Sequence, residues 1–425
     1  MERYCYDFPG NGVGGRRPSR RLRLPLVHQG KEMHNVFIFL CAFAVLLVHK
    51  ASAQGNTRVE ISLDKGWYTR ASDRIQTGID AFDQTAFAKH KWEKVDVPHN
   101  WDGYEGYRRL RHGNRHGYAY YTKTFTVPPQ PKGKRFFLFF EGVSSYATVW
   151  LNKKKVGYHA GGRTTFTIDI TDAVRLNHSN LLAVRADHPP SIQNLPWICG
   201  GCSDERGFSE GSQPMGIFRP VHLVITNDVR IEPFGVHVWN DSTASREQAQ
   251  LSFTTEVKNY SNAVRKVTVV SRLLDKKGTV VSETNSIRSV PSGTITVIKQ
   301  QSPPLRNVTL WSLEDPYLYT LVTEIKENGK VVDRITTPYG IRTIQWPIGR
   351  NNTNQFFLNG KPVFINGIAE YEHLLGNSHA FSAEQIRSRV LQMKTAGFNA
   401  FREAHQPHNL RYQKHWDSLG FLLWT

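Results

Sequence analysis

At 425 residues the chain is too long for one ordinary hydrophobic core, so we expect two or three domains. Hydrophobic residues make up 39% of it and aromatic residues 12%, which excludes general disorder. The formal net charge is +18, but the longest basic run is only Lys153–Lys155 and no nucleic-acid-binding motif accompanies it, so we predict no nucleic-acid partner.

The N-terminal segment predicts export. Residues 36–48 form an uninterrupted run of thirteen apolar residues, and the motif ASA (residues 51–53) follows it. Such a run before an A-x-A site is typical of a secretory signal peptide and is too short to span a membrane comfortably. We therefore predict a signal peptide over Met33–Ala53 and a secreted or periplasmic product without membrane contact after cleavage. The Arg-rich residues 1–32 show no pattern and are interpreted as a non-native extension of the gene start.

Residues 54–227 are predicted to form a β-sandwich or a jelly roll. Short apolar or alternating segments, separated by Gly, Pro and Asn, recur over this region, and no part of it has helical periodicity. The segment VWLNKKKVG is typical of a hairpin with Asn152 and Lys153 near its turn.

Cys199 and Cys202 are the only cysteines after the predicted signal peptide, and they form a CxxC motif in a Gly-rich loop. In an exported protein this motif favours a local disulfide, with two free thiols or a redox pair as the alternatives. No second CxxC and no suitably spaced pair of histidines completes a zinc site.

A second β-sandwich is predicted over residues 228–346. Its segments are again short, strand-like and separated by turn residues. About 115 residues in about seven strands is the size of an immunoglobulin-like domain.

The pattern changes to alternating strands and helices over residues 347–425. A hairpin and a strand are followed by a helix that begins at Ser382, which can form a capping box with Gln385. The strand FNAFR, a helix between Asn409 and Gly420, and the strand FLLWT complete the chain. This order predicts a parallel sheet with helical crossovers. A complete (β/α)8 barrel needs roughly 250 residues, so we expect about three strands of an incomplete one.

Several stretches, in consistent order and spacing, resemble glycoside hydrolase family 2, the family of β-galactosidases, β-glucuronidases and β-mannosidases. They are VPHNW (97–101), GIFRPV (216–221), WSLEDPYLYTL (311–321), YGIRTI (339–344), NGIAEYEH (366–373) and GFNAFREAH (397–405). The resemblance implies a jelly roll that binds sugar over residues 54–227, an immunoglobulin-like sandwich and a TIM barrel. It also implies a retaining exo-β-glycosidase, β-galactosidase-like, that hydrolyses O-glycosyl bonds of a carbohydrate substrate.

The reaction implied by the resemblance is a double displacement, in which one glutamate acts as acid and base and a second attacks the anomeric carbon. In the family these glutamates follow the fourth and seventh barrel strands. Both are expected beyond residue 425, so no catalytic residue is predicted and the chain alone is expected to be inactive. The alternative is a non-catalytic carbohydrate-binding protein, whose sugar affinity would reside in residues 54–346.

Three barrel residues are candidates for substrate binding, because active sites lie at the carboxyl ends of barrel strands. His373 follows the first strand, and Arg402 and His405 follow the second. By resemblance, Arg402 is the family's site arginine and His405 the histidine just beyond it. An ion pair of Arg402 with Glu403, or a core or cap role for His405, is the structural alternative.

In the first domain, Asn100 and Glu210 match positions that contact the sugar in the family's galactosidases. A turn role for Asn100 and a solvated charge at Glu210 are the alternatives. Trp101 and Trp197 could stack on a sugar, although a place in the buried core is the expected one.

The chain also departs from the family pattern. Residues 369–373 read AEYEH where many members have Asn-Arg-His-Glu-His, and Trp424-Thr425 stand where many have Asp-Glu. The particular sugar is therefore not predicted, and neither is the oligomeric state. Some relatives use Mg²⁺ or Na⁺ beside the site, but the residues here do not support either ion, and no cofactor is predicted. His405 and His408 form an HxxH pair, but Pro407 between them argues against a regular helix that presents both, so no metal site is predicted.

Overall fold

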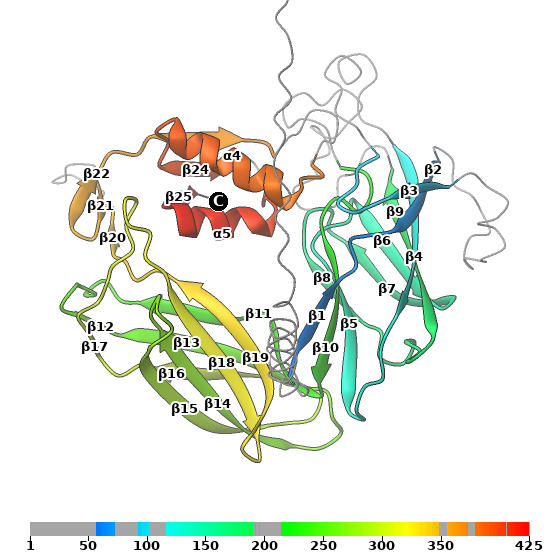
Figure 1. Ribbon diagram of the computed structural model, residues 1–425, viewed down its shortest axis with the longest axis horizontal. Coiled ribbons are helices and arrows are strands. Elements are labelled where there is room, and N and C mark those ends of the chain that lie inside the picture. The colour runs from blue at the N-terminus through cyan, green and yellow to red at the C-terminus, as the bar shows by residue number, and fades with distance from the viewer. Residues whose placement is uncertain are drawn as a thin grey trace, which may run out of the picture. The chain divides into compact units, whose positions relative to one another are not determined.

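The computed structural model describes residues 57–72, 92–101, 116–189, 192, 195, 214–347, 355–372, 379–404 and 406–424 (Figure 1). These belong to one structural unit, Asn56–Thr425. The predicted signal peptide, the CxxC pair and Trp197 lie outside the described residues.

The first domain is a sandwich of two antiparallel sheets, as predicted for a jelly roll. One sheet has the order β1 (Val59–Ser62), β10 (Val221–Asn227), β5 (Lys134–Phe140), β8 (Phe166–Asp169). The other has the order β3 (Glu93–Val95), β2 (Trp67–Ser72), β4 (Gly117–Thr126), β9 (Ser179–His188), β6 (Tyr146–Leu151), β7 (Lys154–Ala160). The hairpin of β6 and β7 turns at Asn152 and Lys153, whose φ angles of 52° and 72° suit a two-residue type I′ turn, and this confirms the predicted hairpin.

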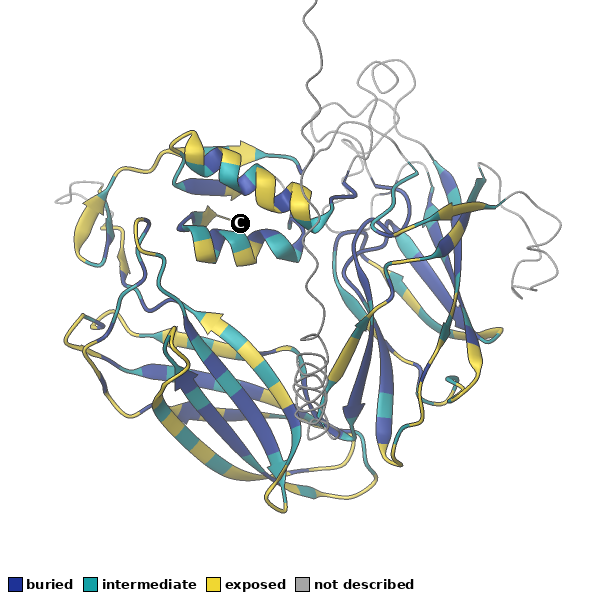
Figure 2. Ribbon diagram, in the orientation of Figure 1, coloured by how far each residue is buried: buried dark blue, intermediate teal, exposed yellow. Residues whose placement is uncertain are grey.

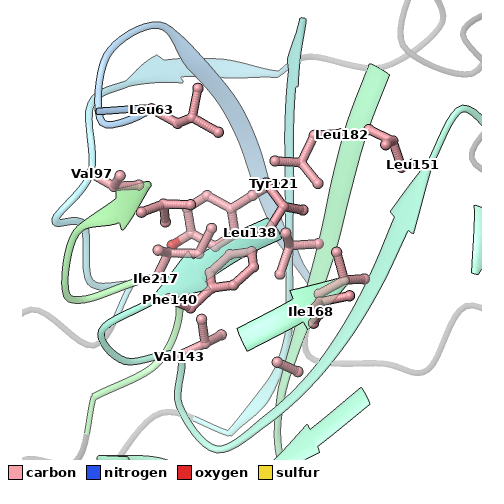
Figure 3. Packing of buried hydrophobic residues seen from close by; sticks show 14 of the residues in the cluster. Leu63, Val97, Tyr121, Leu138, Phe140, Val143, Leu151, Ile168, Leu182 and Ile217 are labelled. Carbon is pink, nitrogen blue, oxygen red and sulfur yellow. The ribbon is translucent and has the colours of Figure 1, made fainter. Parts of the chain in front are cut away.

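Alternation along the strands separates the core of this sandwich from its surfaces. Leu138 and Phe140 of β5 point into the core beside Tyr121 (Figure 3). Phe137 lies on the opposite face of the same strand, where the Arg230 guanidinium stacks 3.6 Å from its ring centroid. One strand thus serves both the core and the contact with the next domain.

The second domain is the predicted immunoglobulin-like sandwich. One sheet has the order β11 (Val229–Asn240), β13 (Leu251–Asn259), β16 (Ile295–Gln301). The other has the order β15 (Val280–Val290), β14 (Arg265–Leu274), β18 (Tyr319–Glu327), β19 (Lys330–Tyr339). Two short strands, β12 (Gln248–Ala249) and β17 (Leu305–Arg306), pair with each other in a separate two-stranded sheet.

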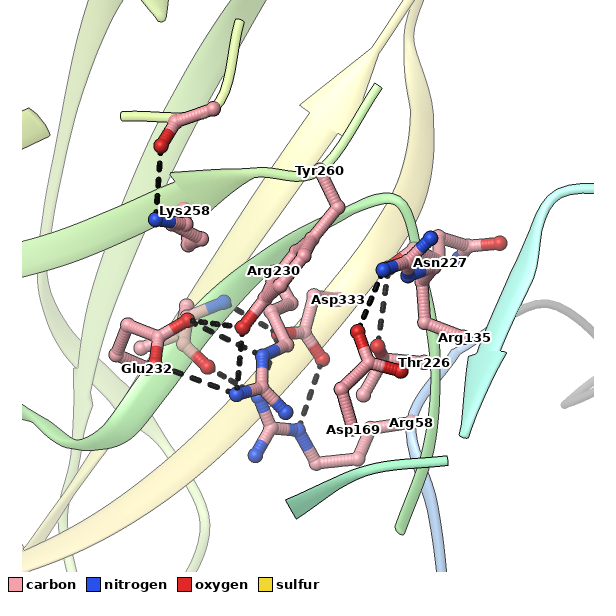
Figure 4. Close-up of polar contacts among 12 residues, drawn as sticks. Arg58, Arg135, Asp169, Thr226, Asn227, Arg230, Glu232, Lys258, Tyr260 and Asp333 are labelled. Carbon is pink, nitrogen blue, oxygen red and sulfur yellow. Dashed lines mark hydrogen bonds and ion pairs between the residues drawn. The ribbon is translucent and has the colours of Figure 1, made fainter. Parts of the chain in front are cut away.

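A buried ion pair joins the two sandwiches. Asp333 of β19 is fully buried and accepts hydrogen bonds from Arg58 Nε at 3.1 Å and Nη2 at 2.8 Å (Figure 4). The same carboxylate accepts the Ile231 N–H at 2.7 Å. Arg58, which precedes β1, is therefore tied to a strand 275 residues away.

The last part of the chain has the predicted strand–helix order. After the hairpin strands β20 (Ile344–Gln345), β21 (Phe356–Leu358) and β22 (Lys361–Val363) come β23 (Gly367–Glu370), α4 (Ala383–Thr395), β24 (Ala400–Glu403), α5 (Leu410–Leu419) and β25 (Leu422–Trp424). β23 pairs with β24, and β24 with β25, in parallel, which confirms the predicted parallel sheet.

The helix ends also follow the sequence signals. Ser382 forms the predicted capping box with Gln385, and Asn409 caps α5, which ends at Gly420 in the left-handed conformation. Each helix buries one side and exposes the other (Figure 2). Among the described residues, no helix has both the length and the apolar character that a membrane span requires.

Candidate functional site

The three parallel strands bring candidate side chains to one face of their sheet. Phe401 points toward the helices and stacks on Trp416 with 4.4 Å between ring centroids. Because side chains alternate along a strand, its neighbour Arg402 lies on the opposite face, and its partners in register are Ala369 and Trp424. All three of these residues are exposed. We call this surface the inner face of the barrel sheet.

A cavity of about 390 Å³ adjoins the inner face. Ala400 and Leu422 line it from the beginning of β24 and β25, and Trp346 and Trp424 line it as an aromatic pair whose rings meet edge to face at 6.0 Å. Exposed aromatic surface therefore lies on the same face as the Arg402 guanidinium.

The opposite face of the sheet carries carboxylates that serve the fold. Glu370 accepts hydrogen bonds from Arg389 of α4 at 2.6–2.8 Å. Glu403, its partner in register, is buried, and its Oε1 atom has no hydrogen-bond partner in the described part of the chain. Burial raises the pKa of Glu403 to about 7, and the neighbouring Glu372 charge adds to the rise. Glu403 and Arg402 lie on opposite faces of β24, so the neighbour pair considered from the sequence is not brought together.

Glu372 follows β23 and is the most enclosed carboxylate near the site. It has no exposed surface, and its φ angle is 52°. Its Oε2 accepts a hydrogen bond from Arg219 Nη2 at 3.1 Å, and its Oε1 accepts the N–H of Asn409, the cap of α5, at 2.7 Å. Arg219 belongs to the GIFRPV segment of the jelly roll, and sequence reasoning did not assign it to the site.

A second jelly-roll arginine reaches the same region. Arg163 is buried, and its Nη2 lies 3.2 Å from His379 Nε2, shortly before α4. The only advance signal for Arg219 is a charged residue inside a segment that otherwise reads as a strand, whereas Arg163 lies in a Gly-rich connection between β7 and β8 and gives no such signal.

In the first domain, Asn100 lies where two of the recognised segments pair. Its Oδ1 accepts the Met215 N–H at 3.0 Å, and the Trp101 N–H donates to the Met215 carbonyl at 2.8 Å. Trp101 packs against the jelly-roll core and donates from Nε1 to Thr69 Oγ1 at 2.9 Å, as expected of a core side chain.

The remaining predicted site residues, Glu210, His373 and His405, lie outside the described residues, and their roles stay predictions. Within the described ranges, no group of three or more His, Cys, Asp and Glu side chains is arranged to hold a metal ion.

Three family models match successive parts of the chain. Residues 108–195 match the model described as glycosyl hydrolase 2 galactose-binding domain-like, and residues 229–342 match glycosyl hydrolases family 2. Residues 350–424 match the TIM barrel domain of glycosyl hydrolases family 2. The three segments follow the order of the jelly roll, the immunoglobulin-like sandwich and the parallel sheet.

Curated relatives cover nearly the whole chain. The β-galactosidase BoGH2A of Bacteroides ovatus is 30% identical over 379 residues, which are 88% of this chain and 42% of that protein. A β-glucuronidase of Bacteroides fragilis is 28% identical over 398 residues, 92% of this chain and 52% of that protein. The chain spans about half the length of these curated relatives.

A solved structure shares both sandwiches and the barrel segment. The crystal structure of a putative β-galactosidase from Bacteroides fragilis aligns with a TM-score of 0.73 at 25% identity, over 87% of this chain and 53% of that one. With three family models matched in succession and relatives that run through all three domains, the chain belongs to glycoside hydrolase family 2.

Proposed function

We propose that the chain acts in the hydrolysis of O-glycosyl bonds and forms the sugar-binding part of a retaining exo-β-glycosidase, β-galactosidase-like, in carbohydrate metabolism. The observation that carries the proposal is Arg402, which lies exposed on the inner face at the carboxyl end of a barrel strand, where this fold places its sites. The names of the relatives, β-galactosidase and β-glucuronidase, support the reaction class.

The chemistry available to Arg402 suits a sugar ring. Its guanidinium offers several N–H donors in a rigid planar fork, which can hold two neighbouring hydroxyls, or one hydroxyl and a carboxylate. Asn100, Glu210, His373 and His405 are proposed to add further hydrogen bonds from both domains. The two glutamates of the retaining reaction are not assigned among these 425 residues, so we expect this polypeptide to bind glycosides without cleaving them.

The test measures binding and cleavage separately on the full chain. Saturation-transfer NMR with the methyl β-glycosides of galactose, glucuronate and mannose is expected to show one of them binding saturably with a Kd near 1 mM, about −4 kcal/mol. The Arg402→Ala variant should bind that glycoside about tenfold or more weakly, because a charge-assisted hydrogen bond contributes about 1.5–3 kcal/mol. Arg387→Ala, which removes an exposed arginine from α4, is the matched control and should bind normally.

Each outcome decides between the candidates. Binding that survives Arg402→Ala unchanged would place the sugar on the sandwiches and favour the non-catalytic carbohydrate-binding protein. Release of p-nitrophenol from aryl β-glycosides by the wild-type chain would contradict the expected inactivity, and no binding of any of the three sugars would contradict the proposal itself.

We also infer that the protein is exported by a signal peptide over Met33–Ala53, on the sequence pattern alone. N-terminal sequencing of the secreted protein is expected to begin at Gln54. A mature N-terminus upstream of Met33 would contradict this inference.

A further inference from the structure

We propose that Arg219 is a positioning residue, which holds the connections after β23 and β24 against the jelly roll and thereby keeps the strand end that carries Arg402 in place to bind sugar. The inference rests on the proposed function, because it concerns the same site.

The Arg219 guanidinium spans two connections at once. Its side chain is 2% exposed, and Nη2 donates to Glu372 Oε2 at 3.1 Å and to the Pro407 carbonyl at 2.7 Å. Glu372 lies two residues beyond β23, and Pro407 lies four residues beyond β24. One planar side chain from the first domain therefore fixes the distance between the two connections.

The ion pair extends to the beginning of α5. Glu372 Oε1 accepts the N–H of Asn409, so the same carboxylate that meets Arg219 also orients the first turn of that helix. Both members of the pair are buried, so loss of either one leaves an uncompensated charge away from water.

A neighbouring arginine contacts the other end of the connection after β23. Nη1 of Arg219 donates to the Arg163 carbonyl at 2.9 Å, and the Arg163 side chain faces His379 at 3.2–3.4 Å. His379 precedes α4, in the segment that leaves β23. The jelly roll thus contacts the connections after both strands through two adjacent buried arginines.

The location of these contacts argues for a role beyond stability. All of them lie on connections at the carboxyl ends of the strands, the edge at which barrels bind their substrates, whereas contacts at the other edge serve stability. Glu372 also holds a left-handed backbone conformation that a non-glycine residue adopts at a cost, and such residues gather at functional sites. Arg402 lies near the end of β24, five residues before Pro407 in the sequence.

The test uses the full chain with Arg219→Met, Arg219→Lys and the double variant Arg219→Met/Glu372→Gln. Hydrogen exchange is followed at the Asn409 amide and in the peptides over residues 367–372 and 400–412, with β4 and β9 as internal references. Arg219→Met is expected to speed exchange there at least tenfold while β4 and β9 keep their protection. It should also weaken binding of the methyl β-glycoside about tenfold.

The double variant separates positioning from charge balance. It removes both buried charges, so any loss of global stability should be largely restored. Exchange at residues 400–412 should nevertheless stay fast and binding weak, because the three-way contact is still absent. Arg219→Lys, which keeps the charge without the fork, should also bind weakly. These two variants keep the test decisive even where Arg219→Met fails to fold.

Arg230→Met is the matched control. Arg230 is an equally buried arginine that pairs with Glu232 of its own strand and contacts Tyr260 and Phe137, none of which lies on the connections after β23 and β24. It should leave exchange at residues 400–412 and sugar binding unchanged. Unaltered exchange in Arg219→Met, or binding that recovers together with protection in the double variant, would overturn the proposal. A wild-type chain that binds no glycoside would instead contradict the proposed function, and the exchange data would still decide whether Arg219 holds the connections.

Discussion

Replacement of Trp416 by alanine is expected to lower the free energy of unfolding of the barrel segment by about 3–5 kcal/mol, the usual cost of removing a large aromatic side chain from a core. Trp416 is 1% exposed and stacks on Phe401 of β24, and its ring also contacts Tyr412 at 5.5 Å and Phe421 at 4.9 Å. Trp416, on α5, also shares one buried cluster with Ile386, Val390 and Met393 of α4, so this core joins both helices to the parallel sheet. Protection of the amides of α4 and α5 against hydrogen exchange is the appropriate measurement, because a chain of several domains need not unfold in one step.

The control for this prediction is Trp239→Ala. Trp239 lies on β11 and is 46% exposed, so its removal should change stability by less than about 1 kcal/mol. If Trp416→Ala left the protection of α4 and α5 unchanged, the helices would not be packed on the sheet as described.

Replacement of Asp333 by alanine is expected to destabilise the two sandwiches by about 3–5 kcal/mol, because the loss of one partner leaves a buried charge uncompensated. The Arg58 guanidinium, 15% exposed, and the Ile231 N–H both donate to this carboxylate, and the substitution would remove their acceptor. Urea unfolding followed by the far-ultraviolet signal of the β-strands should show the loss as a lower midpoint.

An exposed ion pair provides the comparison. Asp315 lies 3.9 Å from Lys276, and the two side chains are 66% and 50% exposed. Asp315→Ala should cost at most about 1 kcal/mol, since exposed pairs contribute little. Equal shifts of the urea midpoint in Asp333→Ala and Asp315→Ala would contradict a buried ion pair between the two sandwiches.

The local elements could be predicted because their signals are local. Ser382 and Gln385 are three residues apart, and the side chain of each accepts a hydrogen bond from the backbone N–H of the other. Four consecutive residues are therefore enough to predict where α4 begins. Asn152 is a residue type that tolerates the positive φ angle that a tight hairpin requires, and Lys153 beside it adopts one as well. The parallel sheet followed from the strand–helix order, since parallel strands need a crossover.

Part of the site could be predicted in the same way. The alternation of a strand that buries Phe401 places Arg402 on the other face, where it is exposed beside Trp424. The same alternation places Arg402 and Glu403 on opposite faces of β24, so the structure does not bring together the ion pair that the sequence left open.

The contacts between domains could not be predicted, because their physical cause is not local. Arg219 and Glu372 are 153 residues apart, and nothing near either one indicates that each is the other's buried counter-charge. Arg58 and Asp333 are 275 residues apart and raise the same difficulty. Only the packed domains show which charged side chains are buried against each other.

A crystal structure of the full chain in complex with the methyl β-glycoside that it binds would test the central claim most directly. The account predicts that the sugar lies at the carboxyl ends of β23–β25, with a hydroxyl within hydrogen-bonding distance of the Arg402 guanidinium. A sugar bound only to one of the sandwiches, or a C-terminal segment folded without the parallel sheet, would contradict it.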